Sequence, residues 1–257
     1  MDPDVLMELA QQLVAMAEER GVTLRIIGHL AVRSHVEKHR ALIDALERLP
    51  THDIDWMGYS KDRNAANAFF IDEMGYEPDP NVAHSQDYGI QRLIYYRDDG
   101  LLVEIFLDQL RMAHTLDFRD RLELDSPTNS LVDLLLSKLQ IVEINEKDIQ
   151  DLIVLLAEHD LGPGDRDLID MDYMLQLTKS DWGLYYTSQV NLGKAREFAG
   201  HYDVIDDAIR QNVEGKIDEI LGRMEAAPKS LKWKARARVG TKVKWYEDVG
   251  DVQRGHG

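Results

Sequence analysis

Two aspartates separated by one residue are the clearest chemical signal in the sequence. Asp53 and Asp55 lie in THDIDWMGY at residues 51–59, where acidic and apolar residues alternate as in a β-strand. Side chains two apart on a strand share a face, which places the two carboxylates about 7 Å apart. Like charges held that close need a cation, and Mg²⁺ takes oxygen ligands while keeping positions open for phosphate oxygens. The alternative is a solvated surface pair, since the chain contains 47 Asp and Glu.

Glu104 is a third acidic residue, placed where burial is expected. It lies in the apolar segment LLVEIFL at residues 101–107, which has the composition of a strand inside a sheet. Burying an unpaired carboxylate is costly, so Glu104 needs a partner. A metal ion shared with Asp53 and Asp55 is one candidate, and Arg92 on the preceding expected strand is the other.

Gly28 and His29 follow a short apolar run, LRII at residues 24–27. A strand that ends in glycine and turns directly into a helix leaves backbone N–H groups free at the positive end of the helix dipole. Such a turn suits an anion, and a triphosphate would fit there. The alternative is an ordinary turn glycine with no ligand.

A mixed sheet is needed to bring these residues together, and the apolar pattern predicts one. The expected strands are residues 24–27, 51–59, 90–96 and 101–107, and the expected helices are residues 4–20, 30–49 and 64–74. This order favours an α+β fold, in which a mixed β-sheet is flanked by helices.

The second half of the sequence predicts helices. Apolar residues recur at helical spacing over residues 130–145, 146–158, 165–178 and 192–226. The Gly-Pro-Gly sequence at 162–164 is the clearest break in the chain. We therefore expect a sheet-containing domain at residues 1–162 and a helical C-terminal region with a basic tail at residues 163–257.

Composition excludes several classes of protein. The chain has 257 residues, 44% of them hydrophobic, so it can bury a core. It has no cysteine, which rules out a disulfide scaffold and fits a reducing compartment. The sequence predicts neither an export signal nor a membrane-spanning segment, because charges interrupt the longest apolar stretch at residues 131–144. A cytoplasmic location without a membrane partner is expected.

The basic tail contrasts with the chain as a whole, which has a formal charge of −17. Residues 229–244 carry seven Lys or Arg and no acid, with Trp233 inside the run and Trp245 just after it. Cations interleaved with aromatic residues suit phosphates and unpaired bases. The alternative is a solvated segment, or one that folds back on the acidic body by attraction.

The order of these motifs resembles the nucleotidyltransferase superfamily. That family has a Gly followed by Gly or Ser, then Asp-x-Asp, then an acid on a later strand. The corresponding segments here are GHLA at 28–31, THDID at 51–55 and VEIF at 103–106. Residues 131–156 look like the helical region of its AbiEii/AbiGii toxin-like branch, and the resemblance covers about residues 22–160.

The resemblance implies roles for individual residues. Asp53 and Asp55 would bind Mg²⁺, and Glu104 would complete the metal site and accept the proton of an acceptor hydroxyl. Gly28 would lie against the triphosphate. His29 departs from the family pattern, because a bulky side chain stands where the phosphates would approach. It would narrow the pocket, contact a phosphate itself, or mark the loss of nucleotide transfer.

Four further residues match the helical region of the toxin-like branch. Lys138 would neutralise phosphate charge or lie on the helix surface, and Lys147, Asp148 and Asp151 would form a structural salt-bridge cluster.

The implied activity is transfer of a nucleoside monophosphate from a nucleoside triphosphate to a hydroxyl group of RNA, protein or a small molecule. Two alternatives come from other classes. The first is a non-catalytic nucleotide-binding module, which His29 favours. The second is a toxin-like interaction protein held by an antitoxin.

Overall fold

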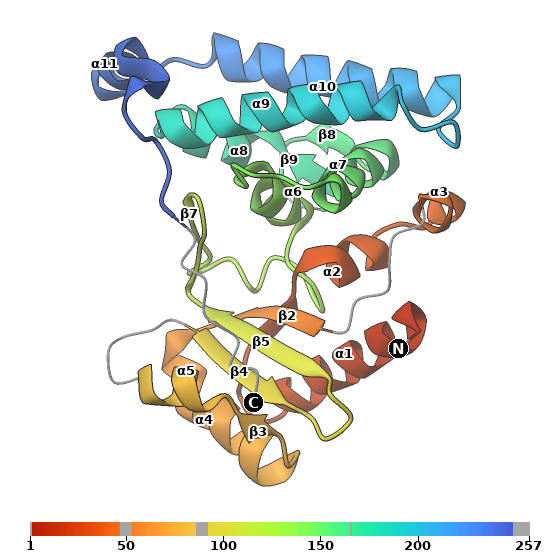
Figure 1. Cartoon of the computed structure of the whole chain (residues 1–257), viewed down its shortest axis with the longest axis vertical. Coiled ribbons are helices and arrows are strands. Elements are labelled where there is room, and N and C mark those ends of the chain that lie inside the picture. Colours follow the sequence, from red (N-terminus) through yellow and green to blue (C-terminus); the bar gives the residue numbers. More distant parts are fainter. Residues whose placement is uncertain (1, 47–52, 86–91, 165, 249–257) are drawn as a thin grey trace.

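The sheet and the later helices follow one another along the long axis of the molecule (Figure 1). The computed structural model describes residues 2–46, 53–85, 92–164 and 166–248. The expected helix end at residue 49, the first residues of the strands expected at 51 and 90, and the last residues of the basic tail lie outside these ranges.

The sheet has five strands in the order β1-β2-β5-β4-β3. The strands are β1 Leu24–Ile26, β2 Asp53–Gly58, β3 Glu77–Pro78, β4 Arg92–Tyr96 and β5 Leu102–Leu107. β2 and β5 are parallel, and the other neighbouring strands are antiparallel. The expected mixed sheet is confirmed. The sequence misses β3, whose two residues are too few to show an alternation.

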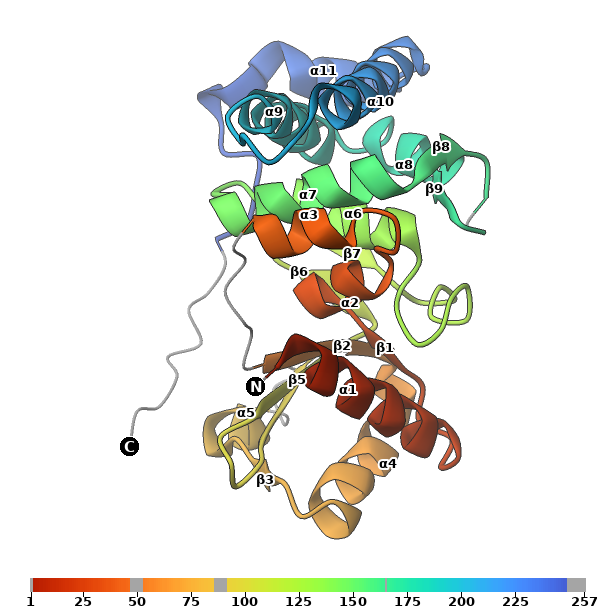
Figure 2. The same ribbon diagram turned by 90° about the vertical axis from the view of Figure 1, so that its right-hand side faces the viewer.

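Helices flank the sheet on both faces. They are α1 Pro3–Glu18, α2 Gly28–Ser34, α3 Arg40–Ala45, the 3₁₀ turn η1 Ser60–Asp62, α4 Arg63–Asn67, its π-helical continuation η2 Ala68–Glu73, and α5 Pro80–Ser85. Figures 1 and 2 show α4 on the face of the sheet away from the later helices and α2 on the face toward them. Under the sheet, Phe70 stacks on Tyr95 with ring centroids 4.9 Å apart, so the far face of the sheet is filled by core side chains.

The helix expected at residues 30–49 is divided into α2 and α3, and the prediction of one helix is wrong. Glu158 causes the division, because its carboxylate accepts hydrogen bonds from the backbone N–H groups of Lys38 and His39. Although burial acts in the opposite direction, these bonds lower the pKa of Glu158 to about 2. A carboxylate from a distant helix thus binds the backbone just before α3.

The later helices form a second layer beyond α2. The elements are the β6–β7 hairpin (Gln109–Arg111 and Thr115–Asp117), α6 Leu131–Leu139, α7 Glu146–Glu158, the parallel pair β8 Asp160–Gly162 and β9 Leu168–Asp170, α8 Met171–Thr178, α9 Trp182–Ala199, α10 Asp207–Ala226, α11 Leu231–Val239 and the 3₁₀ turn η4 Gly240–Lys242. The expected helical C-terminal region is confirmed. Within the described ranges, no helix combines the length and the apolar composition needed to span a bilayer.

The helix expected at residues 192–226 is two helices, α9 and α10. Side-chain caps fix their starts, since Asp181 accepts from the N–H groups of Gly183 and Leu184, and Asp206 accepts from that of Ile209. α6 packs against α9, and α7 packs against both α9 and α10. The division of the chain after residue 162 stays a prediction.

Candidate active site

Parallel pairing of β2 with β5 brings the three predicted acidic residues together. Asp55 lies directly opposite Glu104 in the register, and Asp53 lies opposite Leu102. Opposed residues on parallel strands share a face of the sheet, as do residues two apart on one strand. Glu104 is only 5% exposed, and the two aspartates are half-buried. We refer to Asp53, Asp55 and Glu104 as the strand cluster.

Crowding of negative charge in the strand cluster changes the acidity of Asp55. Burial, together with the neighbouring charges of Glu104 and Asp53, raises the pKa of Asp55 to about 7, while Lys138 and Arg92 act in the opposite direction. The nearby cations therefore compensate only part of the negative charge. A divalent cation would favour the ionised form of this group.

Glu104 forms an ion pair with Arg92 of β4, one of the two partners that its burial predicts. The guanidinium of Arg92 also lies 5.2 Å from the centre of the Phe106 ring. Among the described residues, no three His, Asp or Glu side chains are arranged to hold a metal ion as they stand. The donor set of the strand cluster nevertheless has the oxygen chemistry that Mg²⁺ prefers.

Gly28 lies against the strand cluster at the start of α2. Its φ of +72° is in the left-handed region, which favours glycine. A Cβ atom at this position would lie 3.2 Å from Oδ2 of Asp55, closer than ordinary van der Waals contact. The backbone N–H of Ile27 donates to the carbonyl oxygen of Asp55 at 2.9 Å. Both backbone conformation and space therefore require glycine here.

His29, the departure from the family pattern, is held by α7. Its Nδ1 lies 2.8 Å from Oδ1 of Asp151, and its side chain is 11% exposed. The ring is therefore fixed by a hydrogen bond to the helical layer.

Lys138 of α6 forms ion pairs with two aspartates of α7, the helix that also holds His29. Its Nζ lies 2.7 Å from Asp148 and 2.9 Å from Asp151, and we refer to Asp148 and Asp151 as the helix cluster. Although burial acts in the opposite direction, these two carboxylates raise the pKa of Lys138. The prediction that Lys147 belongs to this cluster is wrong, because Lys147 is exposed and Lys138 supplies the charge.

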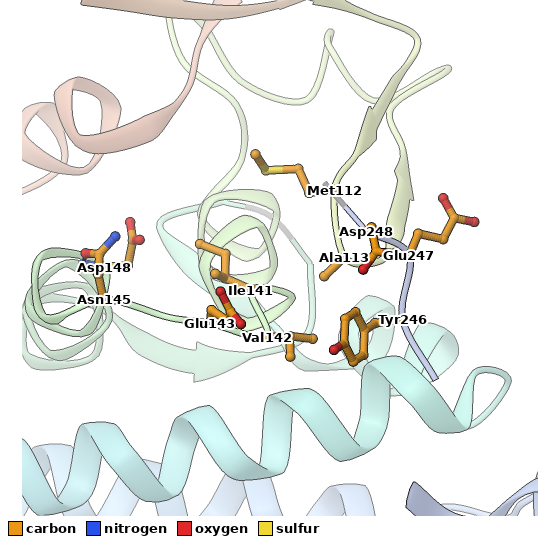
Figure 3. A pocket seen from close by; sticks show the side chains of 10 residues that line it. All are labelled: Met112, Ala113, Ile141, Val142, Glu143, Asn145, Asp148, Tyr246, Glu247 and Asp248. Carbon is orange, nitrogen blue, oxygen red and sulfur yellow. Dashed lines mark hydrogen bonds between the residues drawn. The ribbon is translucent and has the colours of Figure 1, made fainter. Parts of the chain in front are cut away.

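A pocket of about 440 Å³ adjoins the helix cluster (Figure 3). Its lining comes from the β6–β7 loop, the turn between α6 and α7, and the segment after α11: Met112, Ala113, Ile141, Val142, Glu143, Asn145, Asp148, Tyr246, Glu247 and Asp248. The N–H of Glu247 donates to the carbonyl oxygen of Ala113 at 2.9 Å, which ties the last segment to the hairpin. Residues 246–248 could not be predicted as part of the pocket, because nothing in their local pattern indicates where they dock.

Comparison with known proteins gives a distant structural likeness. No family model matches the sequence, and no curated protein matches it. Among solved structures, the solution structure of the antibiotic-resistance factor ANT(2'')-Ia is similar over 60% of this chain and 84% of that chain, with a TM-score of 0.39 and 17% identity. Activity is therefore argued from the residues of the site.

Proposed function

We propose that this chain is a metal-dependent nucleotidyltransferase, which transfers a nucleoside monophosphate from a nucleoside triphosphate to a hydroxyl acceptor. The strand cluster carries the proposal. Asp53 and Asp55 of β2 share one face of the sheet with Glu104 of β5, and burial together with the charges of Glu104 and Asp53 raises the pKa of Asp55 to about 7. Such an excess of carboxylate beside a glycine turn suits a metal-bound phosphate substrate.

Asp53 and Asp55 are the residues that would hold Mg²⁺, with Glu104 as the third carboxylate of the set. When bound, Mg²⁺ would orient phosphate oxygens and neutralise charge as it builds. Glu104 is kept beside Asp55 by its register and by Arg92. We assign Glu104 to accept the proton of the acceptor hydroxyl.

The transfer step forms one bond and breaks another. The acceptor oxygen attacks the α-phosphorus, the bond from that phosphorus to the bridging oxygen breaks, and pyrophosphate leaves. The hydroxyl proton passes to Glu104. Metal dependence, the choice of acceptor among RNA, protein and small molecules, and membership of the AbiEii/AbiGii-like branch are parts of this proposal.

The phosphate side of the site is formed by α2 and α6. Gly28 leaves the space beside Asp55 free of a side chain, and we assign it to lie against the triphosphate. Lys138 acts on Asp55 through its charge, and we assign it to offset phosphate charge in addition to its ion pairs. The non-catalytic alternative depends on His29 blocking the turn, and the hydrogen bond from His29 to Asp151 supports the catalytic proposal instead.

Labelled substrate tests the proposal directly. The protein is incubated with Mg²⁺ and each α-labelled nucleoside triphosphate, together with total cellular RNA or lysate, and label is sought in RNA, protein and small molecules. We expect label transfer by wild type, loss in Asp53→Asn and Asp55→Asn, and retention in Asp72→Asn, which alters an exposed aspartate outside the site. Undiminished transfer by either strand-cluster variant contradicts the assigned site. A cytoplasmic location and an antitoxin partner stay predictions from the sequence.

A further inference from the structure

The basic segment at residues 229–244 folds as α11 and the turn after it. It lies at the end of the helical layer, beside α9 (Figure 1). The sequence leaves two possibilities for its seven cations: contact with a polyanion, or attraction to the acidic body of the protein. The contacts of α11 distinguish these possibilities.

Aromatic rings and backbone carbonyls hold α11 on the body. Trp233 donates from its indole N–H to the carbonyl oxygen of Thr178 at 3.1 Å, and its ring meets the edge of Tyr185. Arg236 lies 4.6 Å from the centre of the Trp182 ring. Its guanidinium also donates to the carbonyl oxygens of Gly240 and Val243 at 2.7 and 2.8 Å. Within the part of the chain that the structure describes, no acidic side chain forms an ion pair with α11.

Four cations of the segment remain outside these contacts. Lys232, Lys234, Arg238 and Lys242 are exposed, and none of them forms an ion pair with a described carboxylate. The ion pair that the segment does form, between Lys244 and Asp248, follows the turn. Attraction to the acidic body therefore leaves most of the positive charge directed at solvent.

We propose that the exposed cations of α11 bind the phosphodiester backbone of a nucleic acid. Exposed cations close together on one short helix suit phosphates, and on a chain of formal charge −17 they are a local exception that would orient a polyanion. Trp233 and Trp245 donate their indole N–H groups to Thr178 and Thr187 and contact the rings of Tyr185 and Tyr186, so both side chains are held against the body of the protein. Binding through the backbone is accordingly expected to show strong salt dependence and little sequence preference. This surface is separate from the strand cluster, and the proposal does not rest on nucleotidyl transfer.

The test compares two variants with the same change in net charge. The α11 variant carries Lys232→Gln, Lys234→Gln and Arg238→Gln. The control carries Lys38→Gln, Lys61→Gln and Lys147→Gln, which are exposed cations outside α11. The three altered side chains of α11 are exposed, so the melting temperature of the α11 variant should match that of wild type. This melting temperature is measured first.

Binding is measured by fluorescence anisotropy with a single-stranded RNA of about 20 nucleotides, which exceeds the usual site size. A DNA of the same sequence distinguishes the two sources of phosphodiester. Between about 50 and 200 mM salt, we expect the α11 variant to reduce the slope of log affinity against log salt by about 2 and to lower affinity about tenfold or more. The control should bind as wild type does.

Two results overturn the proposal. The first is absence of nucleic-acid binding by wild type, including the case in which wild type binds vesicles of anionic lipid instead. The second is equal binding of nucleic acid by the α11 variant and wild type. The vesicle arm is included because Leu231, Val239 and Val243 are exposed apolar side chains of the segment. Asp53→Asn separates this proposal from the catalytic one, since it should bind RNA normally even where nucleotide transfer is lost.

Discussion

Two groups of carboxylates lie on either side of α2, and they differ in how their charge is compensated. Gly28 at the start of α2 approaches Asp55 of the strand cluster, and His29, the next residue, bonds Asp151 of the helix cluster. In the helix cluster, one buried lysine contacts both carboxylates, and a histidine adds a further hydrogen bond. In the strand cluster, three carboxylates share one face of the sheet beside Arg92.

This difference separates a structural role from a binding role. The helix cluster raises the pKa of its lysine, so its charges stabilise one another. In the strand cluster, burial and the neighbouring carboxylates raise the pKa of Asp55 to about 7, so its charges oppose one another. Acidic residues of the same type thus stabilise the fold in one cluster and are suited to bind a cation in the other. The balance of charge around them determines the role. Four substitutions test the comparison.

The largest loss of stability is expected from Lys138→Met. Removing this ammonium leaves Asp148 and Asp151 without their shared cation, and breaking a buried ion pair from one side costs about 3–5 kcal/mol in the free energy of unfolding. Urea unfolding measures the loss. Lys147→Met is the matched control, because Lys147 is exposed, and a change within about 0.5 kcal/mol is expected there. Equal stabilities for the two variants would remove the structural role of the helix cluster.

The next largest effect is on activity, and it comes from the strand cluster. Asp55→Asn removes one charge from the crowded set, so without metal its stability should equal or exceed that of wild type. Its nucleotide transfer with Mg²⁺ should fall by about a hundredfold or more, because charge stabilisation by a metal contributes several kcal/mol. Transfer kinetics and thermal unfolding are measured on one preparation. If Asp55→Asn is less stable than wild type and still active, Asp55 has a structural role and not a role in binding.

The same crowding predicts a smaller effect of pH on stability. The folded protein raises the pKa of Asp55 from 3.8 to about 7, so between these values it binds a proton that the unfolded chain releases. The stabilisation is complete below the unfolded pKa and is lost as pH rises through the folded one. From about pH 5 to pH 8, metal-free wild type should therefore lose more thermal stability than Asp55→Asn does.

Melting temperatures of both proteins across this range, in chelator, check the expectation. Titration of groups far from Asp55 is common to both proteins and cancels in their difference. Adding Mg²⁺ at the upper end should raise the melting temperature of wild type and leave Asp55→Asn nearly unchanged. Parallel curves for the two proteins would show that Asp55 does not titrate in this way.

Local pattern was enough to predict the strands of the site but not the register between them. Alternation along β2 predicts that Asp53 and Asp55 share a face, and apolar neighbours predict that Glu104 is buried. Parallel pairing of β2 with β5 places Asp55 opposite Glu104, and no local pattern encodes that pairing. The sequence analysis could therefore name two partners for Glu104, and the structure shows its ion pair with Arg92.

Contacts between segments that are distant in the sequence explain three features that local pattern did not predict. Residues 30–49 have helical periodicity throughout, yet Glu158 on α7 captures the backbone of Lys38 and His39 and divides the helix. The sequence pattern predicted that Lys147 pairs with Asp148 and Asp151, whereas the packing of α6 on α7 brings Lys138 to both carboxylates. The docking of Tyr246–Asp248 beside the β6–β7 hairpin also could not be predicted from local pattern, because it depends on a contact between distant segments.

The smallest effect is expected from His29→Ala, at the point where α2 joins the two clusters. The substitution removes one hydrogen bond to Asp151, while the pair between Lys138 and Asp151 remains. A loss of about 1 kcal/mol in unfolding free energy is expected. Because the ring is held toward α7, nucleotide affinity should change by no more than about threefold, which is under 1 kcal/mol.

Gly28→Ala provides the contrast one residue away. A Cβ atom there meets Oδ2 of Asp55, and its φ of +72° strains any side chain, so it should weaken nucleotide binding far more than His29→Ala does. Calorimetric titration of each protein with a nucleoside triphosphate and Mg²⁺ compares them. If wild type binds no triphosphate and His29→Ala does, the histidine blocks the turn and the chain is a retained scaffold. If Gly28→Ala binds as tightly as wild type, the triphosphate does not lie against Gly28, and the strand cluster must be approached from another side.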